Sequence, residues 1–65
     1  MWLSVCVSHN YEQIKKLLSL LHSNNILTKV IRRESDETFY EVFVPYTELE
    51  EAQNIIFEDD LFNWY

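Results

Sequence analysis

Apolar and polar residues alternate at the start of the chain. The alternation over residues 2–7 is typical of a β-strand that is covered on at least one side. One face of this strand would carry Leu3, Val5 and Val7, and the other face Trp2, Ser4 and Cys6. The sequence therefore predicts a strand at the beginning of the fold.

A helical spacing replaces the alternation at residue 11. Apolar residues recur at intervals of three and four, which places one stripe against a core. The stripe consists of Tyr11, Ile14, Leu17, Leu18 and Leu21. Asn10 and Gln13 have the spacing of a capping box, so we expect the helix to begin directly after Asn10. It should end near Asn24 and Asn25, because asparagine tolerates the left-handed backbone conformation better than most residues other than glycine.

Two strand-like runs follow the first helix. Residues 27–33 and 38–44 are rich in β-forming side chains, and the polar residues 34–37 between them suit a hairpin loop. Pro45 ends the second run. This part of the chain therefore predicts a β-hairpin.

A second helix is predicted after the hairpin. Thr47 and Glu50 repeat the capping-box spacing at its beginning. Its inward-facing residues would be Leu49, Ala52, Ile56 and Ile55. The acidic residues 58–60 are unfavourable at a helix C-terminus, where the dipole prefers cations, so we expect the helix to end there.

The resulting order, β-α-β-β-α, predicts an α+β fold in which two helices pack on one face of a three-stranded sheet. In the third strand, one side carries Phe39, Glu41 and Phe43, and the other side Tyr40, Val42 and Val44. Either assignment leaves large apolar residues on the open face, with Trp2 and Cys6 beside them. We expect such a surface to bind a second copy of the chain or a ligand.

The chain has 65 residues and 48% hydrophobic content, which leaves room for one core. Residues 1–65 are therefore predicted to form a single domain, with an aromatic C-terminal extension from about residue 59. The sequence contains no glycine. Phosphate-binding P-loops, dinucleotide-binding turns and EF-hand loops need glycine for positive φ or for close approach of the backbone, so these classes of site are excluded.

Charge is divided unevenly along the chain. Five basic and eleven acidic residues give a formal net charge of −6, which argues against nucleic acid as a partner. All five bases lie in residues 1–33 with one acid, Glu12, and the other ten acids lie in residues 34–65. We interpret this division as two halves that pack side by side and partly neutralise each other. The alternative is contact between neighbouring copies, or with a basic partner.

Cys6 is the single cysteine, so no internal disulfide can form, and we expect a cytoplasmic protein. The apolar run at residues 2–7 is too short to span a membrane. Together with His9 and His22, the cysteine provides too few ligands for zinc. We therefore predict no catalytic residue, no metal, no cofactor and no enzymatic activity.

The turn between the first strand and the first helix is a candidate anion site. Backbone N–H groups at a helix N-terminus attract anions, and arginines of the second strand could lie near it. The residues of this candidate site are Ser8, His9, Asn10, Arg32 and Arg33. Two features oppose it: Asn10 already occupies one N–H group as the cap, and Glu12 places a negative charge in the first turn.

Aromatic residues make up 15% of the chain. Some must belong to the core, and we expect the others to anchor an interface, because tryptophan and tyrosine are enriched at binding hot spots. The candidate interface residues are Trp2, Phe39, Phe43, Phe62, Trp64 and Tyr65. RNA-binding sheets also carry aromatic residues, but they need basic surroundings, and the third strand lies in the acidic half.

Several short motifs together resemble a known family. They are Met1-Trp2, Ser8-x-Asn10 followed by Glu12, Leu17-Leu18, Ile26, Val42-Phe43-Val44-Pro45, Glu51-Ala52 and Ile55-Ile56. With them the chain resembles, over nearly its whole length, a small bacterial family of proposed prokaryotic signal-transducing proteins that are otherwise of unknown function. The resemblance implies a ferredoxin-like fold related to that of the nitrogen-regulatory PII proteins, but no catalytic residues and no nucleotide binding. The chain departs from the family at Asn25, where glycine is usual, and at Gln13, where alanine is common.

These observations favour a non-enzymatic interaction module with a role in signal transduction. We expect it to form a homodimer, or to bind another protein, through the open face of the sheet or through the C-terminal aromatic residues. The alternative function is a regulatory domain that binds a small anionic ligand at the turn of Ser8, His9 and Asn10.

Overall fold

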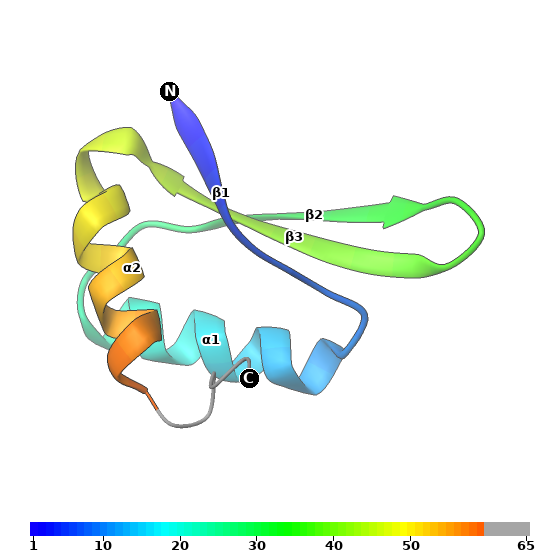
Figure 1. Cartoon of the computed structure of the whole chain (residues 1–65), viewed down its shortest axis with the longest axis horizontal. Helices are drawn as coiled ribbons and strands as arrows, with labels where there is room; N and C mark the ends of the chain where they lie inside the picture. The colour runs from blue at the N-terminus through cyan, green and yellow to red at the C-terminus, as the bar shows by residue number, and fades with distance from the viewer. Residues whose placement is uncertain (60–65) are drawn as a thin grey trace.

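The computed structural model describes residues 1–59 and arranges them as a sheet with two helices packed against it (Figure 1). Its elements in chain order are β1 (Trp2–Ser8), α1 (Tyr11–Ser23), β2 (Lys29–Glu34), β3 (Thr38–Pro45), the 3₁₀ helix η1 (Tyr46–Glu48) and α2 (Leu49–Glu58). The sheet is three-stranded, antiparallel and open. The α+β class predicted from the hydrophobic pattern is therefore confirmed.

β3 is the central strand of the sheet, which has the order β1-β3-β2. Because β3 is antiparallel to both neighbours, β1 and β2 run in the same direction on either side of it. Both helices lie on one side of the sheet, below the β2–β3 hairpin in Figure 1, and the tip of the hairpin extends beyond α1. The opposite side of the sheet is not covered by any described element.

The two helices and β3 share a single core. The side chains with no exposed area are those of Ile14, Leu17, Leu21, Val42, Val44 and Ala52. Burying a Val, Leu or Ile side chain of this kind stabilises the fold by about 1.5–3 kcal/mol. Of the two sides of the third strand, the one carrying Val42 and Val44 is therefore the covered side.

A β-bulge interrupts the ladder between β1 and β3. Ser4 lies opposite Phe43, but the next pair along the ladder joins Cys6 to Val42. Val5 is therefore an extra residue in β1, and its side chain packs against the core. The alternation of residues 2–7 does not indicate this bulge, because the extra residue is apolar and fits the strand pattern.

The bulge changes which side chains of β1 face the core. Residues opposite one another in an antiparallel pair point to the same side of the sheet, so Cys6 is buried beneath the helices with 9% of its surface exposed. Val7 turns to the open face and is 51% exposed. Two predictions are therefore wrong: Val7 does not share a face with Leu3, and Cys6 does not lie beside Trp2.

α1 begins at the predicted cap. Asn10 Oδ1 accepts a hydrogen bond from the backbone N–H of Gln13 at 3.2 Å. The second half of the capping box runs through Ser8, whose Oγ accepts from the Asn10 N–H at 3.0 Å and donates to Gln13 Oε1 at 2.9 Å. Three side chains therefore satisfy the groups at this helix end.

α1 ends in a Schellman motif built without glycine. Asn25 has φ 61°, the one positive φ among the described residues. The Ile26 N–H donates to the Leu21 carbonyl at 3.0 Å, and the Asn25 N–H donates to the His22 carbonyl at 3.0 Å. Ile26 and Leu21 are both buried in the core. The prediction that asparagine takes the place of glycine here is confirmed.

α2 begins later than the capping-box spacing indicates. Residues 46–48 form η1, and the N-cap position of α2 is occupied by Glu48, which makes no side-chain cap. The prediction that Thr47 caps this helix is therefore wrong. The backbone leaves the strand through Pro45 and forms a 3₁₀ turn first, and the Glu48 carboxylate accepts a hydrogen bond from the Leu27 N–H at 3.3 Å instead.

Candidate functional site: the open face of the sheet

The uncovered side of the sheet is the candidate functional site, and we call it the open face. The register places on it Trp2, Ser4 and Val7 of β1, Lys29, Ile31 and Arg33 of β2, and Phe39, Glu41 and Phe43 of β3. Trp2 and Val7 are exposed, whereas Ile31 and the two phenylalanines are half-buried among their neighbours. The structure therefore brings the candidate interface residues Trp2, Phe39 and Phe43 onto one surface.

An ion pair occupies the middle of the open face. Arg33 Nε donates to Glu41 Oε1 at 2.8 Å, and 19% of the Glu41 side chain is exposed. The hydrogen bond from Arg33, followed by one from Ser4, holds the pKa of the Glu41 carboxyl below its ordinary value, although desolvation acts in the opposite direction. Because this carboxylate is already paired, the apolar residues around it can be covered without leaving a buried charge unsatisfied.

A tryptophan and a lysine meet at one end of the open face. Lys29 Nζ lies 5.9 Å from the centroid of the Trp2 ring, within the range of a cation–π interaction. Lys29 and Ser4 are the register partners of Phe43 on its two sides. The end of the open face nearest the chain start therefore carries two aromatic rings and one cation.

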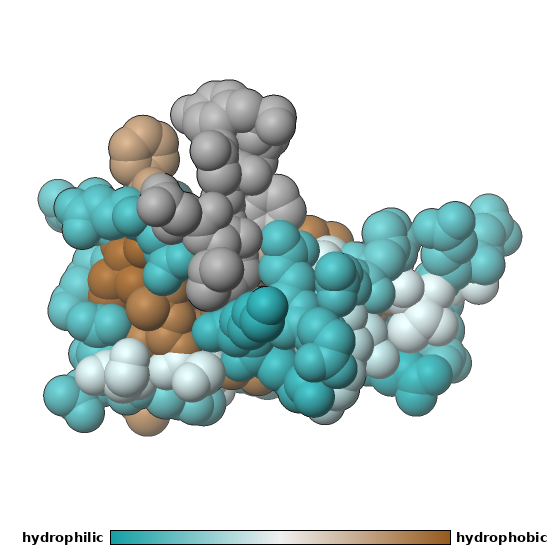
Figure 2. Space-filling model, turned by 90° about the horizontal axis from the view of Figure 1, so that it is seen from below, coloured by the Kyte–Doolittle hydropathy of each residue, from teal (hydrophilic) through white to brown (hydrophobic). Residues whose placement is uncertain are grey.

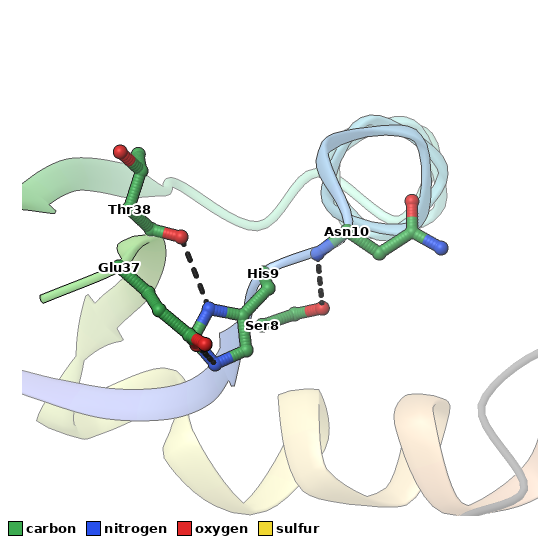
Figure 3. Close-up of polar contacts among 5 residues, drawn as sticks. All are labelled: Ser8, His9, Asn10, Glu37 and Thr38. Carbon is green, nitrogen blue, oxygen red and sulfur yellow. Dashed lines mark hydrogen bonds and ion pairs between the residues drawn. The ribbon is translucent and has the colours of Figure 1, made fainter.

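At the other end, His9 connects the β1–α1 turn to the hairpin (Figure 3). Its Nδ1 lies 3.0 Å from the Thr38 carbonyl oxygen, and its Nε2 lies 3.4 Å from Glu37 Oε2. The ring also meets Phe39 edge-on, with the two centroids 6.0 Å apart. His9 was predicted to belong to the anion site, but in the structure its ring faces the hairpin and the rim of the open face.

The polar groups of Ser8 and Asn10 are engaged with each other and with Gln13 as the cap of α1. The two arginines predicted to join them lie on opposite sides of β2. Arg33 is on the open face with Glu41, whereas Arg32 is on the helix side, with its Nη2 2.6 Å from Glu34 Oε1. The structure thus divides the five residues of the candidate anion site among four places, and anion binding at the turn stays a prediction.

The ion pairs agree with the interpretation that the basic and acidic halves of the chain pack side by side. Arg32 and Arg33 come from the basic half of the sequence, and Glu34 and Glu41 come from the acidic half. His9 and Glu37 make a further contact between the two halves. The two halves therefore neutralise each other partly along the hairpin.

Cys6 and His22 lie away from the open face. Cys6 is buried in the core, and desolvation raises the pKa of its thiol. His22 Nε2 lies 2.7 Å from Thr28 Oγ1, which connects the end of α1 to the segment before β2. Within residues 1–59, no group of three or more His, Cys, Asp or Glu side chains is arranged to hold a metal ion.

Five residues of the open face were not identified from the sequence as site residues, namely Ser4, Val7, Lys29, Ile31 and Glu41. Val7 lies on the open face because of the bulge, and the alternation in the sequence does not indicate the bulge. Glu41 was placed on the same side of the third strand as Phe39 and Phe43, and the charge spacing along the hairpin could have identified Arg33 as its partner. The candidate interface residues Phe62, Trp64 and Tyr65 lie outside the described residues.

Comparison with protein-family models, curated proteins and solved structures finds no match. No helix within residues 1–59 is long and apolar enough to cross a membrane.

Proposed function

We propose that the chain is a ferredoxin-like interaction module that associates with a second copy of itself through the open face. The strand order β1-β3-β2, with α1 crossing between two edge strands of the same direction, supports the ferredoxin-like arrangement. The resemblance to a family of proposed bacterial signal-transducing proteins supports a cytoplasmic role in signalling rather than in catalysis.

The distribution of charge in space is the observation that carries this proposal. The segment from the start of η1 to Asp59, the residue after α2, has five acidic residues and no basic residue. They are Glu48, Glu50, Glu51, Glu58 and Asp59. The open face instead has Lys29, Arg33 and one acid, Glu41. In a chain with a net charge of −6, two copies therefore meet with less repulsion through the open face than through the segment from η1 to Asp59.

The helix side also carries apolar residues in contact with solvent. Figure 2 shows this side as a mostly hydrophilic surface that is interrupted by an apolar area. Phe57 of α2 is 81% exposed, but Glu58 follows it directly. Two copies that met at Phe57 would bring acidic residues together. A variant of Phe57 therefore serves as the control for variants of the open face.

The size of the open face indicates weak association. Three strands about 4.8 Å apart, with 7, 6 and 8 residues, give a footprint of roughly 350 Å² per copy. A stable complex of standard size buries about 800 Å² per partner. We therefore expect a dissociation constant in the micromolar range or above, which suits a module whose assembly responds to concentration or to conditions.

Sedimentation velocity across a concentration series from about 1 µM to 1 mM tests the proposal. The chain should change from monomer to dimer within this range. The variants Trp2→Ala and Phe43→Ala should each weaken association by about fivefold or more, because large aromatic side chains supply much of the contact area of an interface.

Phe57→Ala is the matched control, since it removes an exposed aromatic ring from the opposite side of the molecule. It should leave the dissociation constant unchanged. A chain that stays monomeric at 1 mM, or a dimer lost in Phe57→Ala and kept in Phe43→Ala, contradicts the proposal. Loss of the dimer in Trp64→Ala alone would assign association to the C-terminal aromatic residues instead.

A second candidate function is the binding of a small anionic ligand at the turn of Ser8, His9 and Asn10. A thermal-shift series with phosphate, nucleotides and carboxylates tests it. A ligand present at 100 times its dissociation constant stabilises the folded state by about 2.7 kcal/mol. Absence of a shift with every one of these anions would remove this candidate.

A further inference from the structure

His9 holds the hairpin through two acceptors. The partner of Nδ1 is the Thr38 carbonyl oxygen at 3.0 Å, and the partner of Nε2 is the Glu37 carboxylate at 3.4 Å. Neither acceptor can donate a hydrogen bond once Glu37 is ionised. A neutral imidazole has one N–H and therefore satisfies one of them, whereas an imidazolium donates to both.

Several charged groups on the elements next to His9 have partners of their own. Glu12, in the first turn of α1, lies 3.2 Å from Lys15 Nζ, and Arg33 and Glu41 on the open face bind each other. Asp36 is next to Glu37 in the hairpin loop. Among these acidic groups, Glu37 is the carboxylate in contact with the His9 ring.

We propose that His9 is a proton-dependent clamp that fixes the hairpin tip to the β1–α1 turn and thereby regulates association through the open face. Protonation lets Nε2 form an ion pair with the Glu37 carboxylate while Nδ1 donates to the Thr38 carbonyl, which joins the turn to residues 37 and 38. The ring also sets the position of Phe39, which it contacts edge-on at the rim of the open face. The regulatory step rests on the proposed function, whereas the clamp itself does not.

Amide hydrogen exchange tests the clamp in the monomer, at a concentration at which sedimentation velocity shows no dimer. The protection factors of residues 34–39 should be about twofold to fivefold higher at pH 5.5 than at pH 7.5, as for one exposed ion pair. This difference should disappear in His9→Gln and in Glu37→Gln. It should remain in His22→Gln, the matched control, because the ring of His22 contacts a hydroxyl group and no carboxylate in its hydrogen bond with Thr28. Protection with the same pH dependence in His9→Gln would overturn the clamp.

The dissociation constant of the dimer at the two pH values tests the regulatory step. We expect tighter association at pH 5.5 in the unmodified chain and in His22→Gln, and a reduced ratio in His9→Gln. The comparison with His22→Gln separates the clamp from the general loss of negative charge at low pH. An equal ratio in all three proteins overturns regulation by His9. A chain that is monomeric at both pH values overturns the regulatory step together with the proposed function. In that case the hydrogen-exchange measurement alone shows whether the clamp exists.

Discussion

Arg33 and Glu41 meet across the β2–β3 ladder with Nε and Oε1 2.8 Å apart, in the middle of the open face. Because the pKa of Glu41 is lowered, its charged form stabilises the fold above the ordinary carboxyl range near pH 4.3, and this contribution is lost as the pH falls through the lowered value. We expect Glu41→Gln to reduce the free energy of unfolding at pH 7 by about 0.5–1 kcal/mol. The difference from the unmodified chain should shrink between pH 7 and pH 3 in urea unfolding.

Glu34→Gln is the control for this prediction. Glu34 and Arg32 form an ion pair in the same hairpin, but both side chains are more than half exposed. Exposed pairs contribute little, so the change should be below about 0.5 kcal/mol at either pH. A Glu34→Gln effect as large as that of Glu41→Gln would contradict a special role for the pair on the open face.

Replacing Asn25 by glycine should preserve the stability of the fold, whereas replacing it by alanine should lower it. Its φ of 61° lies in the left-handed region, where a β-carbon raises the energy of the backbone. We expect Asn25→Ala to destabilise the fold by about 1 kcal/mol and Asn25→Gly to leave stability within about 0.5 kcal/mol of the original. Thermal unfolding of the two variants measures the contrast. Equal stability of both variants would mean that the Schellman motif does not depend on this conformation.

The two capping-box spacings in the sequence should behave differently when they are mutated. Asn10→Ala removes the hydrogen bond to the Gln13 N–H and should cost about 1 kcal/mol. Thr47→Ala should change stability by less than about 0.5 kcal/mol, because Thr47 lies within η1 and makes no cap. Urea unfolding of the pair measures both effects, and a larger loss for Thr47→Ala would contradict the observed beginning of α2.

The elements that local chemistry determines were predictable from the sequence. Asn10 and Gln13 mark the beginning of α1, and Asn25 marks its end, because each satisfies backbone groups within a few residues of itself. The face of β3 that carries Val42 and Val44 could not be chosen from its own alternation. Its burial follows from packing against the helices, which is a property of the whole fold.

The candidate site was predictable only in part, for the same reason. The aromatic residues Trp2, Phe39 and Phe43 were identified from their type and spacing, and the register places them on one surface. The contact between His9 and Glu37 joins residues that are far apart in sequence. It exists because the hairpin tip extends past the β1–α1 turn, and no local pattern contains this information.

The bulge at Val5 has a consequence for how relatives of this chain could be recognised. Removing one residue from a strand normally turns every following side chain to the other face. Here the loss of Val5 would leave Ser4 opposite Phe43 and Cys6 opposite Val42, as they are now. A homologous chain that is one residue shorter at this point could therefore keep the same sheet, and an alignment that forbids a gap inside β1 would place its first four residues on the wrong face.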